Sequence, residues 1–187
     1  MVELSSLWLP IIIATVLVFV ASAVLWAALK FHNADWSGLS NEDDVMRVLR
    51  DGGAQPGQYM IPHVPDQKQM KQESVQQKFK TGPIGFLYVA PSGVPAMGGK
   101  LGIQFLYQLV ITAAVAYIAS RVLIAETEYM RVFKFTAAVS FLAYGGALIP
   151  ASNWFAHSWK STAKELFDAL VYALLTAGTF GWLWPQG

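Results

Sequence analysis

Long apolar runs alternate with polar stretches along the chain, and this alternation predicts membrane-spanning helices. The first run, residues 7–29, holds 23 residues without a charge, more than the roughly 20 that a helix needs to cross the hydrocarbon core. Further apolar runs at 101–120, 132–149 and 163–184 are close to that length. We therefore expect an all-α membrane protein, a four-transmembrane-helix bundle forming a single domain over 1–187. One large, partly ordered soluble loop, 30–100, separates the first two helices.

The first apolar run also resembles a secretory signal peptide, because Ala21-Ser22-Ala23 is typical of a cleavage site. No Lys or Arg precedes the run, however, and its hydrophobicity continues past that site to residue 29. We therefore expect a retained helix.

The loop after the first span begins with a helix signal. Ser40 and Asp43 have the spacing of a capping box, and the pair Gly52-Gly53 is a typical stop. Together they predict a three-turn helix with an apolar face.

The rest of the loop contains two short extended segments, 58–61 and 84–90, which can pair as a hairpin or small sheet. The polar segment 66–80 between them fits either a solvated helix or a flexible stretch. The Pro- and Gly-rich residues 91–100 predict a linker back to the membrane.

Polar or small residues recur every fourth position in the later spans, which is typical of helix faces that pack in lipid. In the second span these are Gln104, Gln108, Thr112, Ala116 and Ser120. In the fourth span the helix-packing residues are Ala169, Ala173, Ala177 and Gly181. Thr162 and Glu165 form a capping box that predicts the start of that span, and the pair Gly145-Gly146 predicts a close approach or a bend.

Positively charged residues predict the orientation. The loop 30–100 carries eight Lys and Arg and the connection before the fourth span two, against three on the opposite side. Both termini are therefore expected outside and the loop in the cytoplasm. Tryptophans at the span ends fit interfacial aromatic belts, and they are Trp8, Trp26, Trp36, Trp154, Trp159, Trp182 and Trp184.

Composition supports the membrane class, with 55% hydrophobic residues, 13% charged residues and a mean hydropathy of +0.41. A net charge of +1 gives no reason to expect nucleic acid as a partner. The chain has no cysteine, which excludes disulfides, thiol nucleophiles and thiolate metal sites. No nucleotide-binding or hydrolase motif occurs, so no catalytic residue or cofactor is assigned.

Five segments carry a resemblance to a known family: HNADWSGLSNEDDVMRVLR, PGQYMIP, TGPIGFLYVAP, FLAYGG and FDALVYALLTAGTFGWLWP. Over nearly its whole length the chain resembles an uncharacterised family of small bacterial four-helix integral membrane proteins. The resemblance implies a multi-pass protein of the bacterial inner membrane with one large loop. It carries no activity or functional residue over to this chain.

Polar residues that flank the spans on one membrane face form a candidate cluster. Its members are His32, Asp35, Asn153, His157, Lys164 and Asp168. Two readings stay open. The histidines either anchor helix ends or, with Asp35, provide imidazole and carboxylate ligands for zinc or iron. Asp168 is expected to pair with Lys164 one turn earlier, and it is either structural or a proton or cation site.

Three functions follow as hypotheses. The first is a non-enzymatic accessory or interaction protein in the lipid bilayer, bound to a membrane-protein partner or forming a homo-oligomer. The second is a small transporter or an ion- or proton-conducting protein that uses Asp168. The third is a membrane metal enzyme with a site at His32, Asp35 and His157.

Overall fold

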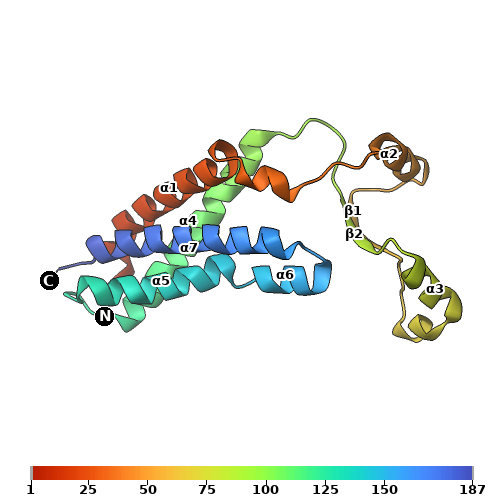
Figure 1. The fold of residues 1–187 in the computed structure, drawn as a ribbon. Helices are drawn as coiled ribbons and strands as arrows, with labels where there is room; N and C mark the ends of the chain where they lie inside the picture. The colour runs from red at the N-terminus through yellow and green to blue at the C-terminus, as the bar shows by residue number, and fades with distance from the viewer. Residues whose placement is uncertain (1, 187) are drawn as a thin grey trace. The chain divides into compact units, whose positions relative to one another are not determined.

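The computed structural model describes residues 2–186, which are mostly helical (Figure 1). The α-helices are α1 (Trp8–Ala23), α2 (Glu42–Asp51), α3 (Glu73–Thr81), α4 (Met97–Val122), α5 (Tyr129–Gly145), α6 (Leu148–Phe155) and α7 (Trp159–Trp182). The strands are β1 (Gly57–Ile61) and β2 (Gly85–Val89). Single turns of 3₁₀ helix cover Leu4–Leu7, Phe31–Asp35 and Gln67–Lys71, and Val24–Ala28 forms a π-helical turn that extends α1.

The chain divides into two compact units. The helical unit contains the described residues of Met1–Trp36, Ala96–Pro150 and Ser158–Gly187. The second unit, which we call the loop unit, contains Ser37–Pro95 and Ala151–His157.

In the helical unit, α1, α4, α5 and α7 pack side by side, and each of them contacts two of the others (Figure 1). The apolar core includes Leu7, Val132, Phe180 and Trp184. Trp184 is 2% exposed and donates its indole N–H to the carbonyl oxygen of Ile124 at 2.9 Å. The prediction that Trp184 belongs to an interfacial belt is therefore wrong, because its ring closes the core at the end of α7.

Small residues bring α5 and α7 close together. Ala169, Ala173 and Ala177 are at most 2% exposed. A Cβ added at Gly145 would lie 3.3 Å from the Cβ of Ala169, so this glycine permits the approach that the sequence indicated. The helix α5 ends at this glycine.

A polar seam joins α1 and α4 inside the unit. The hydroxyl oxygens of Thr15 and Thr112 are 2.7 Å apart, and the side-chain amide of Gln108 donates to the hydroxyl of Ser22 at 3.3 Å. Thr112 and Gln108 are fully buried, whereas Gln104 is exposed, so the predicted stripe faces inward except at that position.

Among residues 2–186, three helical segments are long and apolar enough to cross a membrane. They are Leu4–Ala28, Met97–Val122 and Tyr129–Phe155. The helix α7 has 24 residues but is not in this set. It carries four charged side chains within its first ten residues, Lys160, Lys164, Glu165 and Asp168.

Two predicted helix starts are wrong. The helix α7 begins at Trp159 with Ser158 as its N-cap residue, and the amide of Thr162 already donates to the carbonyl oxygen of Ser158 at 2.9 Å. Thr162 therefore lies inside the first turn. Similarly, Asn41 and not Ser40 precedes α2.

The predicted hairpin is confirmed. Strands β1 and β2 pair antiparallel, with Tyr59 opposite Leu87. The polar segment between them forms a 3₁₀ turn and α3, so it is helical as one of the two readings proposed. Phe86 of β2 packs edge to face on Phe155 at 5.6 Å within the loop unit.

The ends of two other predicted segments differ from the structure. The helix α4 starts at Met97, so the end of the predicted linker 91–100 is helical. The third span was expected to end at Pro150, but Pro150 is the third residue of α6. A proline is tolerated there because the first turn of a helix needs no amide donor.

Candidate functional site

The candidate site is built around His32, which sits in the turn Phe31–Asp35 just after α1. Lys30 has a φ of 56°, and this left-handed residue redirects the chain from the end of α1 into the turn. His32 is 2% exposed. Its ring stacks on the indole of Trp26, with centroids 3.9 Å apart and planes 3° apart.

Both ring nitrogens of His32 contact carboxylate oxygens. Nδ1 lies 2.8 Å from Oδ2 of Asp35, three residues later in the same turn. Nε2 lies 2.9 Å from Oδ2 of Asp168, which comes from α7. The imidazole therefore connects the turn after α1 to the last helix of the unit.

Lys164 makes a second connection between the same two segments. Its Nζ donates to Oδ1 of Asp35 at 2.5 Å and to the carbonyl oxygen of Phe31 at 2.6 Å. It also lies 5.5 Å from the centroid of the Phe31 ring, within the range of a cation–π contact. We call His32, Asp35, Lys164 and Asp168 the ionic cluster.

The ionic cluster is largely removed from water. The side chains of His32, Asp35 and Asp168 are 2%, 8% and 4% exposed, and that of Lys164 is 18% exposed. The hydrogen bond from Lys164 holds the pKa of Asp35 below its usual value of 3.8, and the contact with His32 acts in the same direction. Burial opposes both effects without reversing them.

The two contacts of His32 require one proton more than a neutral imidazole and two carboxylates carry, and we call it the shared proton. An imidazole donates from both nitrogens only in its cationic form, and a neutral ring donates from one and accepts at the other. With two carboxylates at hydrogen-bonding distance, either His32 is protonated between two carboxylates or one carboxyl group carries the proton. In the first state two positive charges balance two negative ones, so the ionic cluster is neutral as a whole.

The structure brings together four of the residues that the sequence singled out, namely the members of the ionic cluster. Asn153 and His157 belong to the loop unit. The expected pair between Lys164 and Asp168 is wrong, because Lys164 pairs with Asp35 while Asp168 contacts His32. The interaction across the fold gives each of the two charges a partner that is itself buried.

Sequence reasoning missed the two aromatic residues that enclose His32. Trp26 was assigned to an interfacial belt and Phe31 was not considered. The ring of Phe31 lies tilted against that of His32, with centroids 4.2 Å apart, and covers the imidazole in addition to the stacked indole. Phe31 directly precedes the histidine and Trp26 lies six residues before it, and these positions at the end of a membrane-length helix were the only signal available.

No group of three or more His, Asp or Glu side chains within the described part of the chain is arranged to hold a metal ion. Both nitrogens of His32 are already engaged by carboxylates. A metal at this histidine would have to displace one of them.

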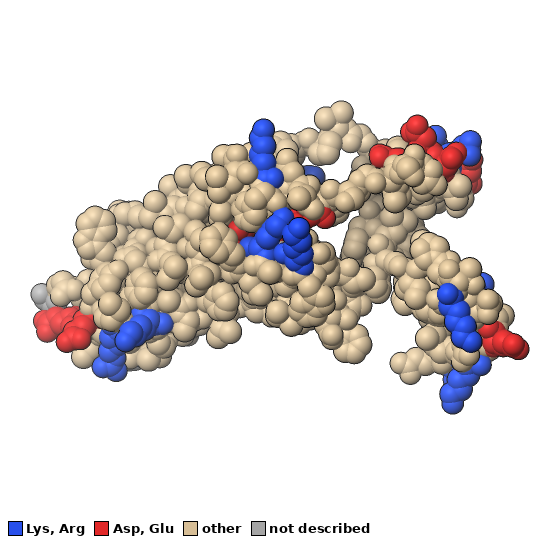
Figure 2. Space-filling model, in the orientation of Figure 1, with Lys and Arg blue, Asp and Glu red and all other residues tan. Residues whose placement is uncertain are grey.

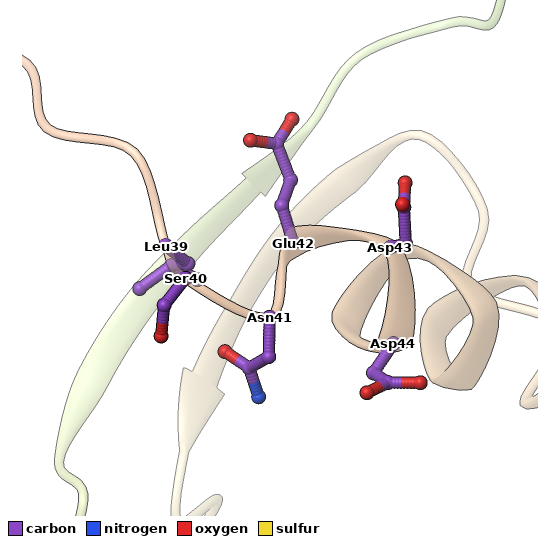
Figure 3. Close-up of a pocket in the computed structure, with 6 residues that line it drawn as sticks. All are labelled: Leu39, Ser40, Asn41, Glu42, Asp43 and Asp44. Atoms are coloured by element: carbon purple, nitrogen blue, oxygen red, sulfur yellow. The ribbon is translucent and has the colours of Figure 1, made fainter.

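A second acidic feature lies at the start of α2 in the loop unit, where Leu39 to Asp44 border a hollow of about 520 Å³ (Figure 3). Figure 3 shows Glu42 and Asp43 on one side of the chain and Asp44 pointing away from them. Asp44 is paired with Arg47 at 2.7 Å. The carboxylates diverge and therefore do not form a common binding point.

Comparison with known proteins adds no assignment: the chain matches no family model, no curated protein and no solved structure.

Proposed function

We propose that the chain is a multi-pass protein of the bacterial inner membrane in which α1, α4, α5 and α7 form a four-helix membrane bundle. It acts by association with a membrane-protein partner or a second copy, without catalysing a reaction. The segment 30–100 then faces the cytoplasm.

The observation that carries this proposal is the distribution of polarity in the helical unit. Large apolar side chains point outward, for example Val20, Ile103 and Leu142, which are 53%, 71% and 68% exposed. Figure 2 shows the uncharged face that results between the charged ends of this unit. An apolar surface of this kind is unfavourable in water and matches the hydrocarbon of a bilayer.

The interior supports the same assignment, because hydroxyl groups are buried on all four helices: Thr15, Thr112, Thr136 and Thr176 are fully buried. Thr15, Thr136 and Thr176 donate to backbone carbonyls four residues earlier, so helix formation itself satisfies them. For α7, no charged residue follows Asp168, so its last turns can lie in lipid while its charged start lies at the interface.

Association is supported by an unused small-residue face on α4. Gly98 and Gly102 have the GxxxG spacing, and a Cβ built at either position would meet nothing within 4 Å. In lipid this spacing lets a second helix approach closely.

Light scattering and crosslinking of the full chain in a mild detergent test this proposal. We expect a dimer or a defined complex that Gly102→Leu dissociates, whereas Val110→Leu, an exposed position on the same helix, leaves it intact. A monodisperse monomer with no co-purifying protein would contradict association.

The shared proton in the ionic cluster favours a second candidate, a proton- or cation-conducting protein that uses Asp168. Conduction requires a group that binds and releases a proton or cation within the bundle. Purified protein in liposomes is then expected to pass protons or cations, and Asp168→Asn to abolish the flux. Glu126→Gln, at the far end of the helical unit, is the control. Equal flux through the wild type and Asp168→Asn would remove this candidate.

A further inference from the structure

A small cavity of about 240 Å³ opens beside the ionic cluster in the helical unit. All four long helical segments contribute to its wall. Its functional groups are four aromatic rings and two carboxyl groups, from Trp26, Tyr107, Tyr144, Tyr172, Glu165 and Asp168.

Three of the four aromatic rings contact one another and form an aromatic wall. The ring of Tyr144 meets that of Tyr172 edge to face at 5.5 Å and that of Tyr107 at 6.4 Å. Trp26 is held in place because His32 stacks on one of its faces. Faces of aromatic rings carry negative potential, so a ring that presents its face to a space attracts a cation into it.

The polar groups of the cavity have the same preference. Neither Lys, Arg nor His is among the residues that line it. Oδ1 of Asp168 is buried and has no hydrogen-bond partner among the described residues, while Oδ2 contacts His32. The hydroxyl oxygen of Tyr144 is likewise buried without a partner. A buried carboxylate oxygen in this state favours a ligand that donates a hydrogen bond.

We propose that this cavity binds the primary ammonium group of a small organic cation. The ammonium N–H groups donate to Oδ1 of Asp168 and to the hydroxyl oxygen of Tyr144, and the aromatic wall stabilises the charge. The volume is below the roughly 300–1,000 Å³ of pockets for drug-sized ligands, so it suits a group of ethanolamine size. That group belongs either to a free amine or to the headgroup of an aminophospholipid.

The test uses the full chain in nanodiscs of phosphatidylglycerol, which has no amine. Calorimetric titration is made with ethanolamine, with choline, which lacks an N–H donor, and with sodium chloride. We expect ethanolamine to bind more tightly than choline and sodium ions not to compete. For the lipid source, the nanodiscs are made with phosphatidylethanolamine, and the lipid retained after detergent exchange is measured by mass spectrometry.

Matched variants on α4 connect binding to the cavity. Tyr107 and Tyr117 are 46% and 51% exposed, and only Tyr107 lines the cavity. Tyr107→Leu is expected to weaken ethanolamine binding by about 2- to 30-fold, the range of a cation–π contact. Tyr107→Phe keeps the ring face and should restore binding, and Tyr117→Leu should have no effect. Circular dichroism checks that each variant is folded.

Either source supports the proposal: ethanolamine binding assigns a free amine, and selective retention of phosphatidylethanolamine assigns a lipid headgroup. Three results would overturn it. They are the absence of both kinds of binding in the folded wild type, equal binding of sodium ions and ethanolamine, and equal loss of binding in the Tyr107→Leu and Tyr117→Leu variants.

Discussion

His32 is the residue on which the geometry of the ionic cluster depends. It contacts Asp35 through one nitrogen and Asp168 through the other, at 2.8 and 2.9 Å. Buried charges are tolerated only when partners replace the water that they lose. Removing the imidazole therefore affects two carboxylates at once.

We expect His32→Leu to lower the free energy of unfolding by about 3 kcal/mol, because it leaves Asp168 buried without its partner. Thermal unfolding in detergent, followed by circular dichroism, measures the loss. His63→Leu is the control, since His63 is exposed in the loop unit. If both variants unfolded at the wild-type temperature, the ionic cluster would contribute nothing to stability.

Asp35 predicts how the stability depends on pH. The hydrogen bond from Lys164 lowers the pKa of Asp35 below 3.8, supported by the contact with His32 and opposed by burial. A lowered pKa in the folded state means that the unfolded chain takes up the proton first as the pH falls. The stabilisation by Asp35 is therefore complete above about pH 4 to 5 and lost as the pH falls through the lowered pKa.

Melting temperatures of the wild type and Asp35→Asn, compared between pH 3 and 7 in about unit steps, test this expectation. The difference between the two proteins should be constant at neutral pH and shrink at the acidic end. The groups near Asp35 are the same in both proteins, and they are Lys164, His32, Ser161 and Asp168. A difference that grew on acidification would contradict the assigned direction.

For the ionic cluster, the sequence predicted which residues lie close together better than it predicted which of them pair. Alternate spans reverse direction, which puts the residues after the first span near those before the fourth. The partner of Lys164 depends on the left-handed Lys30 and on the turn that follows it. A pattern of residue types does not contain that backbone geometry, so the local pair with Asp168 was preferred wrongly.

Among the helices, α5 and α7 approach each other where small residues occur. A Cβ added at Gly181 would lie 2.8 Å from a ring carbon of Tyr129, whereas one at Gly178, three residues earlier, would meet nothing within 4 Å. The two positions belong to the same helix and differ in what they face.

We expect Gly181→Ala to destabilise the protein by about 1–3 kcal/mol, because the ring of Tyr129 must move. Gly178→Ala should be neutral or stabilising by about 0.5–1 kcal/mol, since alanine favours the helix. Thermal unfolding of both variants in the same detergent compares them. Equal effects would mean that the α5–α7 contact is looser than described.

Helices and strands were predictable where the periodicity was strong. The apolar runs and the hairpin of β1 and β2 follow from hydrophobic pattern and turn residues. Helix starts were less predictable, because Thr162 and Ser40 match a capping pattern although another residue occupies the N-cap position in each helix. Ser158 and Asn41 are of favoured N-cap types but make no side-chain cap hydrogen bond, so residue type alone does not distinguish them from Thr162 and Ser40.

For the molecule as a whole, the start of α1 and the end of α7 lie at the same end of the helical unit (Figure 1). Backbone hydrogen bonds join Val2 to Ser120 at 3.3 Å and Glu126 to Pro185 at 3.0 Å at this end. If the bundle spans the membrane, both ends of the chain are therefore on one side, and the ionic cluster is at the opposite face.

The absence of cysteine makes this arrangement directly measurable. Single cysteines replace Ser5 and Gln186 near the two ends and Ser92 in the loop unit, all of which are exposed. Because Lys and Arg concentrate in the loop, we expect a membrane-impermeant maleimide to label the first two in intact spheroplasts. The cysteine at position 92 should react only after permeabilisation. Labelling of position 92 alone would invert the orientation and put the ionic cluster and its cavity on the periplasmic face. Labelling of the two ends from opposite sides would exclude α7 as a fourth span, since an odd number of crossings separates them.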